Sequence, residues 1–289
     1  MKKHLKIIGL ALVCALALSL AACGGAASSA TSATASAADS TAASTAELTT
    51  LTVGATAAPH AEILEAAKPL LAEQGIDLVI QEFDDYVLPN TALQEGDLDA
   101  NYFQHQPYLD YFNEANGTDI VSAGSIHYEP LGIYPGKSTD LAALDGVTIG
   151  IPNDGSNEAR ALYLLEAQGV ITVDHSAGYD ATPIDIPADG NPHNITFVEM
   201  DADKLPSAVQ DVDFAVINGN YAIAAGINET VLVTEEAEGE SAQTYANIVA
   251  VRNGDETRAD IQTLVKVLQS DEIKAFIEEK YQGSVVALG

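Results

Sequence analysis

Cysteine is nearly absent from this sequence. The 289 residues contain only Cys14 and Cys23. Cys14 lies in an apolar N-terminal run that we predict to be cleaved off, and Cys23 follows directly after that run. The remaining chain therefore has no thiol for a disulfide bond, a thiolate metal site or a cysteine nucleophile. Its stability must come from a hydrophobic core, and a fold of roughly 240 residues is large enough to form one.

Basic residues are scarce as well. The chain has 12 Lys and Arg against 42 Asp and Glu, with a formal net charge of −30. Binding to nucleic acid or to anionic lipid depends on basic patches, so both are disfavoured. We interpret the excess of acidic residues as a solvated surface that keeps the protein soluble.

Sequence signatures of catalysis are also missing. There is no Gly-x-Ser-x-Gly, no His-Glu-x-x-His and no phosphate-binding glycine-rich loop with lysine, so we predict no enzyme and no cofactor. The histidines are scattered without the helical spacing of a metal site, and we predict no metal. A metal-capturing protein and a hydrolase stay open as alternatives.

The N-terminus has the features of an export signal. Basic Lys2, Lys3 and Lys6 precede an apolar run from Ile7 to Leu20, which is too short to span a bilayer. Leu-Ala-Ala-Cys at its end resembles the bacterial lipobox, which predicts cleavage after residue 22 and lipidation of Cys23. The segment up to Ala46 is almost entirely Ala, Ser, Thr and Gly, and this composition predicts a disordered linker.

The rest of the chain alternates short β-type runs with helical patterns in two successive units. The first unit has strands near residues 51–55, 77–83 and 98–103, and the second begins at 147–151. This alternation predicts an α/β fold with mostly parallel sheets in two lobes. We interpret Pro130 to Ser138 as a bridge between the units and Ser176 to Asn194 as a long irregular loop. Ligand sites in such folds lie at the carboxyl ends of the strands.

Aromatic residues gather at one of these strand ends. Phe103, His105 and Tyr108 follow a predicted strand, and Tyr86 follows another. Rings at such a junction can form an apolar box with polar tips that suits a small ligand. Ordinary core packing explains the same pattern about as well.

Three polar residues lie at a helix start, at a strand end and inside an apolar strand. Arg160 lies one turn inside a predicted helix, where it opposes the helix dipole and needs a carboxylate partner, either a ligand or a protein side chain. Asn218 ends a buried strand, although asparagine is also common in turns. Asn247 lies within an apolar strand, where its amide needs hydrogen-bond partners.

At these segments the chain resembles the bacterial methionine-binding lipoproteins, the MetQ/NlpA family of ABC-importer substrate-binding proteins. The stretches Phe83–Asn90, Gly96–Asn101 and Phe103–Leu109 carry the resemblance, together with Ile151–Asn153, Ala215–Asn218 and Gln269–Glu272. The resemblance implies a type II periplasmic-binding-protein fold, with two α/β lobes and a ligand cleft between them. It implies a lipid-anchored, extracytoplasmic protein that binds methionine and delivers it to an importer permease and its ATPase.

The resemblance also assigns roles and boundaries. It implies that Tyr86, Phe103, His105 and Tyr108 surround the methionine side chain, that Arg160 pairs with the ligand carboxylate, and that Asn218 and Asn247 bond its backbone groups. We predict a signal peptide over residues 1–22, the lipidated Cys23 and linker over 23–47, lobe 1 over 48–131 plus 240–289, and lobe 2 over 132–239. A different amino acid or a methionine-containing dipeptide is the main alternative ligand.

Overall fold

The computed structural model describes residues 48–237 and 239–288. The predicted signal peptide, the lipidated Cys23 and the linker lie outside the described residues. None of the helices within these two ranges is both long and apolar enough to cross a bilayer.

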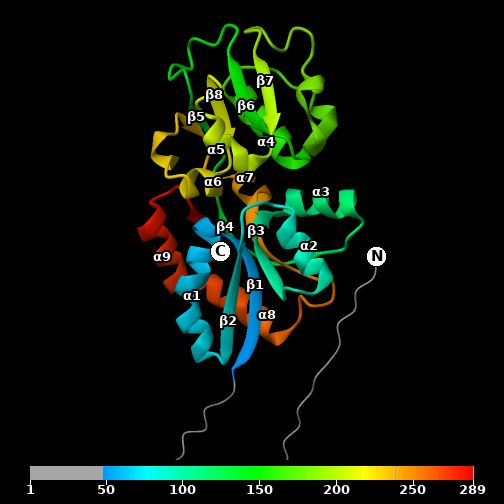
Figure 1. Cartoon of the computed structure of the whole chain (residues 1–289), viewed down its shortest axis with the longest axis vertical. Coiled ribbons are helices and arrows are strands. Elements are labelled where there is room, and N and C mark those ends of the chain that lie inside the picture. Colours follow the sequence, from blue (N-terminus) through cyan, green and yellow to red (C-terminus); the bar gives the residue numbers. More distant parts are fainter. Residues whose placement is uncertain (1–47, 238, 289) are drawn as a thin grey trace, which may run out of the picture. The chain divides into compact units, whose positions relative to one another are not determined.

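Lobe 1, the name used here for the part built on the larger sheet, contains six strands in the order β11-β4-β10-β3-β1-β2 (Figure 1). Their bounds are β1 Thr49–Thr56, β2 Ile76–Phe83, β3 Ala100–His105, β4 Val121–Tyr128, β10 Ala246–Val251 and β11 Val286–Ala287. Strand β1 pairs in parallel with β2 and β3, whereas β10 is antiparallel to both β3 and β4. The sheet is therefore mixed, and the prediction of a mostly parallel sheet is wrong.

Helices cover both faces of this sheet. The helices are α1 Glu62–Glu73, α2 Leu88–Glu95, α3 Gln106–Asn116, α8 Ala259–Leu268 and α9 Asp271–Tyr281. Successive residues of β10 point to opposite faces: Val249 and Val251 pack into one apolar cluster with α1, α8 and α9, while Ile248 and Ala250 pack into another with α2 and α3. A short π-helical turn, Ala57–Ala61, links β1 to α1.

Lobe 2 is built on a five-stranded sheet in the order β7-β6-β8-β5-β9. Its elements are β5 Gly132–Pro135, β6 Thr148–Pro152, α4 Gly155–Ala167, β7 Thr196–Met200, α5 Leu205–Ala208, β8 Phe214–Ile217, α6 Gly219–Ala224 and β9 Val233–Thr234. In β8, Phe214 and Val216 face the cluster under α4, whereas Ala215 and Ile217 face the cluster with α5 and α6. The predicted irregular loop holds two short 3-10 helices, His175–Asp180 and Pro183–Asp185.

Two stretches of chain connect the sheets. Residues 129–131 run from β4 to β5, and residues 235–245, with helix α7 Glu240–Thr244, run from β9 to β10. Strand β5 lies inside the stretch that we interpreted as a bridge, so that interpretation is wrong for residues 132–135. The lobe boundaries at 131/132 and 239/240 stay a prediction.

Candidate functional site

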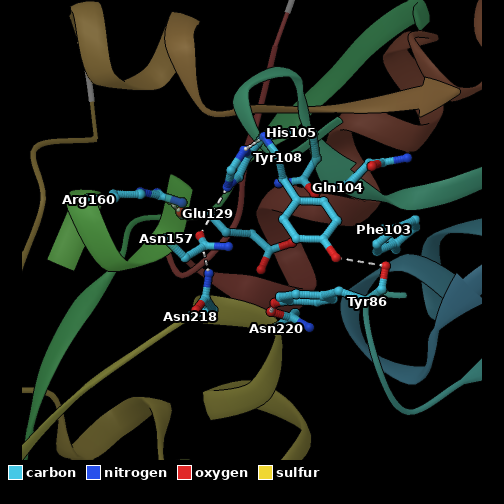
Figure 2. Close-up of a pocket in the computed structure, with 12 residues that line it drawn as sticks. Tyr86, Phe103, Gln104, His105, Tyr108, Glu129, Asn157, Arg160, Asn218 and Asn220 are labelled. Carbon is cyan, nitrogen blue, oxygen red and sulfur yellow. Dashed lines mark hydrogen bonds between the residues drawn. The ribbon is translucent and has the colours of Figure 1, made fainter. Parts of the chain in front are cut away.

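A cavity lies between the two lobes and is lined by residues from both (Figure 2). The lining residues are Tyr86, Phe103, Gln104, His105, Tyr108, Glu129, Asn157, Arg160, Asn218, Gly219, Asn220 and Asn247. All seven residues that we predicted as ligand contacts are among them.

Aromatic rings form one wall of the cavity. The Tyr86 ring lies 5.8 Å from Phe103 and 5.5 Å from Tyr108, measured between ring centroids. Two hydroxyl groups hold these rings in place, because Tyr108 donates to the backbone oxygen of Tyr86 and Tyr86 donates to Oδ1 of Asn220. The wall is therefore apolar in its middle and has its hydroxyls already engaged, which suits an uncharged ligand side chain.

His105 occupies the junction between β3 and α3, and its local structure fixes its ring. It is the N-cap of α3, with extended backbone angles, and its Nδ1 accepts a hydrogen bond from the backbone N–H of Tyr108. A neutral imidazole that accepts at Nδ1 carries its proton on Nε2. Burial and the nearby Arg160 lower the pKa of His105 to about 3, so the ring is neutral at physiological pH.

Helix α4 presents Asn157 and Arg160 on one face, one turn apart. Its N-cap Asp154 accepts hydrogen bonds from both the backbone N–H and the side-chain Nδ2 of Asn157. Because the carboxylate of Asp154 takes the Nδ2 donor, the Oδ1 atom of Asn157 is the one that faces His105 and Asn218.

The hydrogen bonds around Asn157 determine the orientation of the side-chain amide of Asn218. Oδ1 of Asn157 accepts from Nε2 of His105 at 3.1 Å and from Nδ2 of Asn218 at 2.8 Å (Figure 2). The remaining Oδ1 atom of Asn218 is buried and has no hydrogen-bond partner within the described residues. A buried acceptor without a partner is costly, so this atom marks the position of a ligand donor.

We predict that His105 remains a neutral imidazole protonated on Nε2 between pH 5 and 8, because its pKa lies near 3. Nitrogen-detected NMR of histidine-labelled protein will test this, with the His105→Gln variant identifying the signal. A His105 signal that titrates near the ordinary histidine value would contradict the lowered pKa, and a neutral ring with its proton on Nδ1 would contradict the direction of these hydrogen bonds.

Arg160 already has a carboxylate partner in the protein. Its Nε and Nη2 atoms donate to the two oxygens of Glu235 at 2.9 and 2.6 Å, and Nη2 also donates to the backbone oxygen of Glu129. Of the two partners that we considered for Arg160, a ligand or a protein side chain, the structure shows a protein carboxylate. The pair is buried beside the cavity. Burial works to lower the pKa of Arg160, yet the Glu235 carboxylate raises it above its ordinary value. Arg160 therefore stays charged, and within the described residues Nη1 makes no hydrogen bond.

Two of the scattered histidines meet behind the cavity. The Nε2 atoms of His60 and His127 and a carboxylate oxygen of Glu129 lie within 4.8 Å of one another, close enough for a metal ion. The protons are nevertheless placed without one. The Nε2–H of His127 donates to Glu129, whereas the Nε2–H of His60 donates to Oδ1 of Asn247 at 2.9 Å and lies 3.3 Å from Oε1 of Glu129. Each Nδ1 accepts from a hydroxyl, that of Thr56 for His60 and that of Tyr102 for His127. A metal ion bound to both Nε2 atoms would move each ring proton to Nδ1, so both hydroxyls would have to accept instead of donate. The hydrogen of the buried Tyr102 hydroxyl would then have no acceptor among the described residues.

Sequence analysis missed several polar residues of the site. Asn157 lies one turn before Arg160 and was marked only as part of a helix start. Glu129 follows β4, which we did not predict, and Glu235 lies 75 residues beyond its partner Arg160. No local pattern in the sequence indicated either carboxylate.

Comparison with known proteins identifies one family over almost all of the described chain, the family that the sequence resembles. The family model of the NlpA lipoproteins matches residues 51–288. The methionine-binding lipoprotein MetQ of Bacillus subtilis is 42% identical over 242 residues, which cover 82% of this chain and 87% of that protein.

Two solved structures are similar in both sequence and fold. A nutrient-binding protein from Burkholderia cenocepacia bound to methionine has a TM-score of 0.77 and 42% identity, covering 83% of this chain and 100% of that one. An ABC-transporter periplasmic substrate-binding protein from Coxiella burnetii has a TM-score of 0.76 and 39% identity, covering 82% and 100%. The chain belongs to the NlpA lipoprotein family.

Proposed function

We propose that this protein is the substrate-binding lipoprotein of an ABC importer and that it binds methionine in the cavity between its lobes. The observation that carries the proposal is that one cavity brings together a guanidinium, a buried amide oxygen without a partner among the described residues, and an apolar wall of rings. These three features match the carboxylate, the ammonium and the side chain of a free amino acid. No bond is made or broken in this process.

Each part of the ligand has a receiving group in the proposal. The carboxylate accepts from Nη1 of Arg160, the ammonium donates to Oδ1 of Asn218, and the thioether packs against Tyr86, Phe103 and Tyr108. Burial of such a side chain contributes about 1.5–3 kcal/mol, and each hydrogen bond to a charged group about 1.5–3 kcal/mol. Micromolar binding needs about 8 kcal/mol, so several of these contacts must act together.

The relatives support this assignment. MetQ of Bacillus subtilis is a methionine-binding lipoprotein, and the Burkholderia protein holds methionine. The similarity covers the whole part of the chain that supplies the cavity, from Tyr86 to Asn247.

Mass spectrometry of the freshly purified protein under native conditions tests the ligand. We expect a bound mass equal to that of methionine, and calorimetry on protein refolded without ligand should show micromolar or tighter affinity for L-methionine, with D-methionine as the second candidate. Release of a different amino acid or of a methionine-containing dipeptide would change the identity of the ligand. Protein that binds none of these would overturn the proposal.

We further propose that lipid on Cys23 anchors the protein at the extracytoplasmic face of the membrane, beside the permease and ATPase it serves. The lipobox-like sequence before Cys23 and the lipoprotein family support this placement. Metabolic labelling with palmitate should mark the wild-type protein but not the Cys23→Ser variant, which should leave the membrane fraction. Equal labelling of both proteins would disprove the anchor.

A further inference from the structure

One short segment of lobe 2, the 3-10 helix His175–Asp180, has no role in the proposed function. It lies at the start of the long loop that the sequence indicated, and we call it the strap. Its base is tied to α4. The rings of His175 and Tyr163 are stacked with their centroids 4.9 Å apart, and Nε2 of His175 pairs with Glu166 at 2.6 Å. The Tyr163 hydroxyl also donates to the backbone oxygen of Gly178 at 2.6 Å. The strap is therefore fixed to lobe 2.

The tip of the strap reaches a residue of lobe 1. The ring of Tyr179 lies edge-on to the ring of Tyr245, with the centroids 6.4 Å apart. Tyr245 directly precedes β10 of the larger sheet, and its ring lies 5.2 Å from that of His105 at the end of β3. Tyr179 is 50% exposed and Tyr245 only 7%. The ring of the strap therefore covers a buried ring of the other lobe.

Tyr245 lies between the cavity and a groove on its other side. The guanidinium carbon of Arg160 is 4.1 Å from the centroid of the Tyr245 ring. Arg160 and His105 both line the cavity, whereas Tyr245 lines the neighbouring groove together with Tyr179. Tyr245 is thus a layer behind two cavity residues, and Tyr179 contacts that layer from the groove.

A second contact between the lobes lies next to the strap. Tyr111 of α3, in lobe 1, lies against the first residue of α4, in lobe 2, because a Cβ at Gly155 would be only 2.8 Å from Cδ2 of Tyr111. Oδ1 of Asp180, the last residue of the strap, is 3.7 Å from the same Cβ position. Two consecutive residues of the strap, Tyr179 and Asp180, therefore lie where lobe 2 meets lobe 1.

We propose that the strap holds the two lobes together around the bound ligand and slows its release, through the contact of Tyr179 with Tyr245. This rests on the proposed function and deepens it, because it assigns the rate of ligand release to one loop of lobe 2. The two rings belong to different lobes, so separation of the lobes breaks their contact and the contact favours the joined arrangement. The ligand meets the protein before the lobes join, so its rate of association depends little on the contact.

Replacing Tyr179 with alanine tests the proposal. We expect the dissociation rate constant koff of radiolabelled methionine, chased with unlabelled methionine, to rise about 3- to 10-fold, the effect of losing one aromatic pair. The association rate constant kon should change less than about 2-fold, so Kd should rise with koff. Tyr179→Phe keeps the ring and should keep the wild-type koff, because the Tyr179 hydroxyl makes no hydrogen bond within the described residues.

The same loop provides a matched control. Ile184 is 91% exposed, so Ile184→Ala should have the wild-type koff, and thermal melting should confirm that all variants fold. A second measurement uses the absence of tryptophan from the chain. Tyr179→Trp introduces a single emitter on the strap, and its fluorescence should change when methionine is added. Ile184→Trp should show no such change.

The outcomes separate the inference from the proposed function. A wild-type koff in Tyr179→Ala would overturn the inference, and so would an equal rise in koff for Ile184→Ala. Equal increases in kon and koff, with Kd unchanged, would make Tyr179 a gate to the cavity and overturn its role in holding the lobes. A wild-type protein that does not bind methionine would overturn the proposed function, whereas the other outcomes leave that function intact.

Discussion

Replacing Arg160 with alanine is expected to weaken methionine binding by about 100-fold or more. The lost hydrogen bond between a guanidinium and a carboxylate contributes about 1.5–3 kcal/mol, and tenfold in affinity corresponds to about 1.4 kcal/mol. A second effect adds to the first, because Glu235 stays behind without its partner and repels the incoming carboxylate. Isothermal titration calorimetry on ligand-free protein measures the change.

The experiment on Arg160 needs two controls, since its removal also leaves a buried charge. In the double variant Arg160→Ala/Glu235→Gln that charge is gone, and binding should remain weak because the cation is still missing. Arg252→Ala removes an arginine that bonds backbone oxygens of Leu93 and Leu98 outside the cavity, and its affinity should match the wild type. Wild-type affinity in Arg160→Ala would remove Arg160 from the binding site.

Replacing Glu235 with alanine should destabilise the fold strongly. Oε2 of Glu235 accepts from the Tyr128 hydroxyl, the Leu131 N–H and Arg160, and Oε1 accepts from Nε of Arg160. Breaking a buried pair by removing one partner costs about 3–5 kcal/mol. For a domain of this size each kcal/mol corresponds to about 2–4 °C, so the melting temperature should fall by roughly 6–20 °C.

Urea unfolding of the ligand-free protein gives the free energy for this comparison. Glu235→Gln keeps the acceptor oxygen but loses the charge, and should lie between the wild type and Glu235→Ala. Glu65→Ala is a suitable surface control, because Glu65 is exposed and pairs with Lys68 on α1, and exposed pairs contribute about 0–1 kcal/mol. A melting temperature of Glu235→Ala within 2 °C of wild type, taken as about one kcal/mol or less, would contradict the structural role of the pair.

In the sequence, the aromatic residues and Asn218 lie at predicted strand ends, Arg160 at a helix start and Asn247 inside an apolar strand, and the family resemblance assigned all of them to one ligand site. The structure brings all of them to one cavity. Their partners were not predictable in the same way. The Arg160–Glu235 pair joins α4 to the segment after β9, and the His60–Glu129 contact joins the turn after β1 to the end of β4. Such contacts depend on tertiary packing and leave no periodic pattern in the chain.

Strand β4 shows why part of the fold escaped prediction. Its sequence, Val121 to Tyr128, has Ser, Ala and Gly in the middle instead of the β-branched residues that favour strands. Gly124 is required there because a Cβ would lie 2.6 Å from Cγ1 of Val265 on α8. The close approach of α8 therefore requires small residues in β4, where β-branched residues would have indicated a strand. Strand β4 also pairs antiparallel with β10, whereas we had expected mostly parallel strands.

The hydrogen bonds between the lobes have a consequence for transport. Tyr221 donates to the backbone oxygen of Asp84, outside the cavity, and Tyr86 donates to Asn220. These bonds form between groups of the protein itself, so they favour the joined arrangement whether or not a ligand is bound. The apparent dissociation constant depends on the fraction of protein in that arrangement, and Tyr221→Phe would therefore mimic a weaker binder without altering a ligand contact. Lobe closure alone would then not tell an importer whether the binding protein holds a ligand.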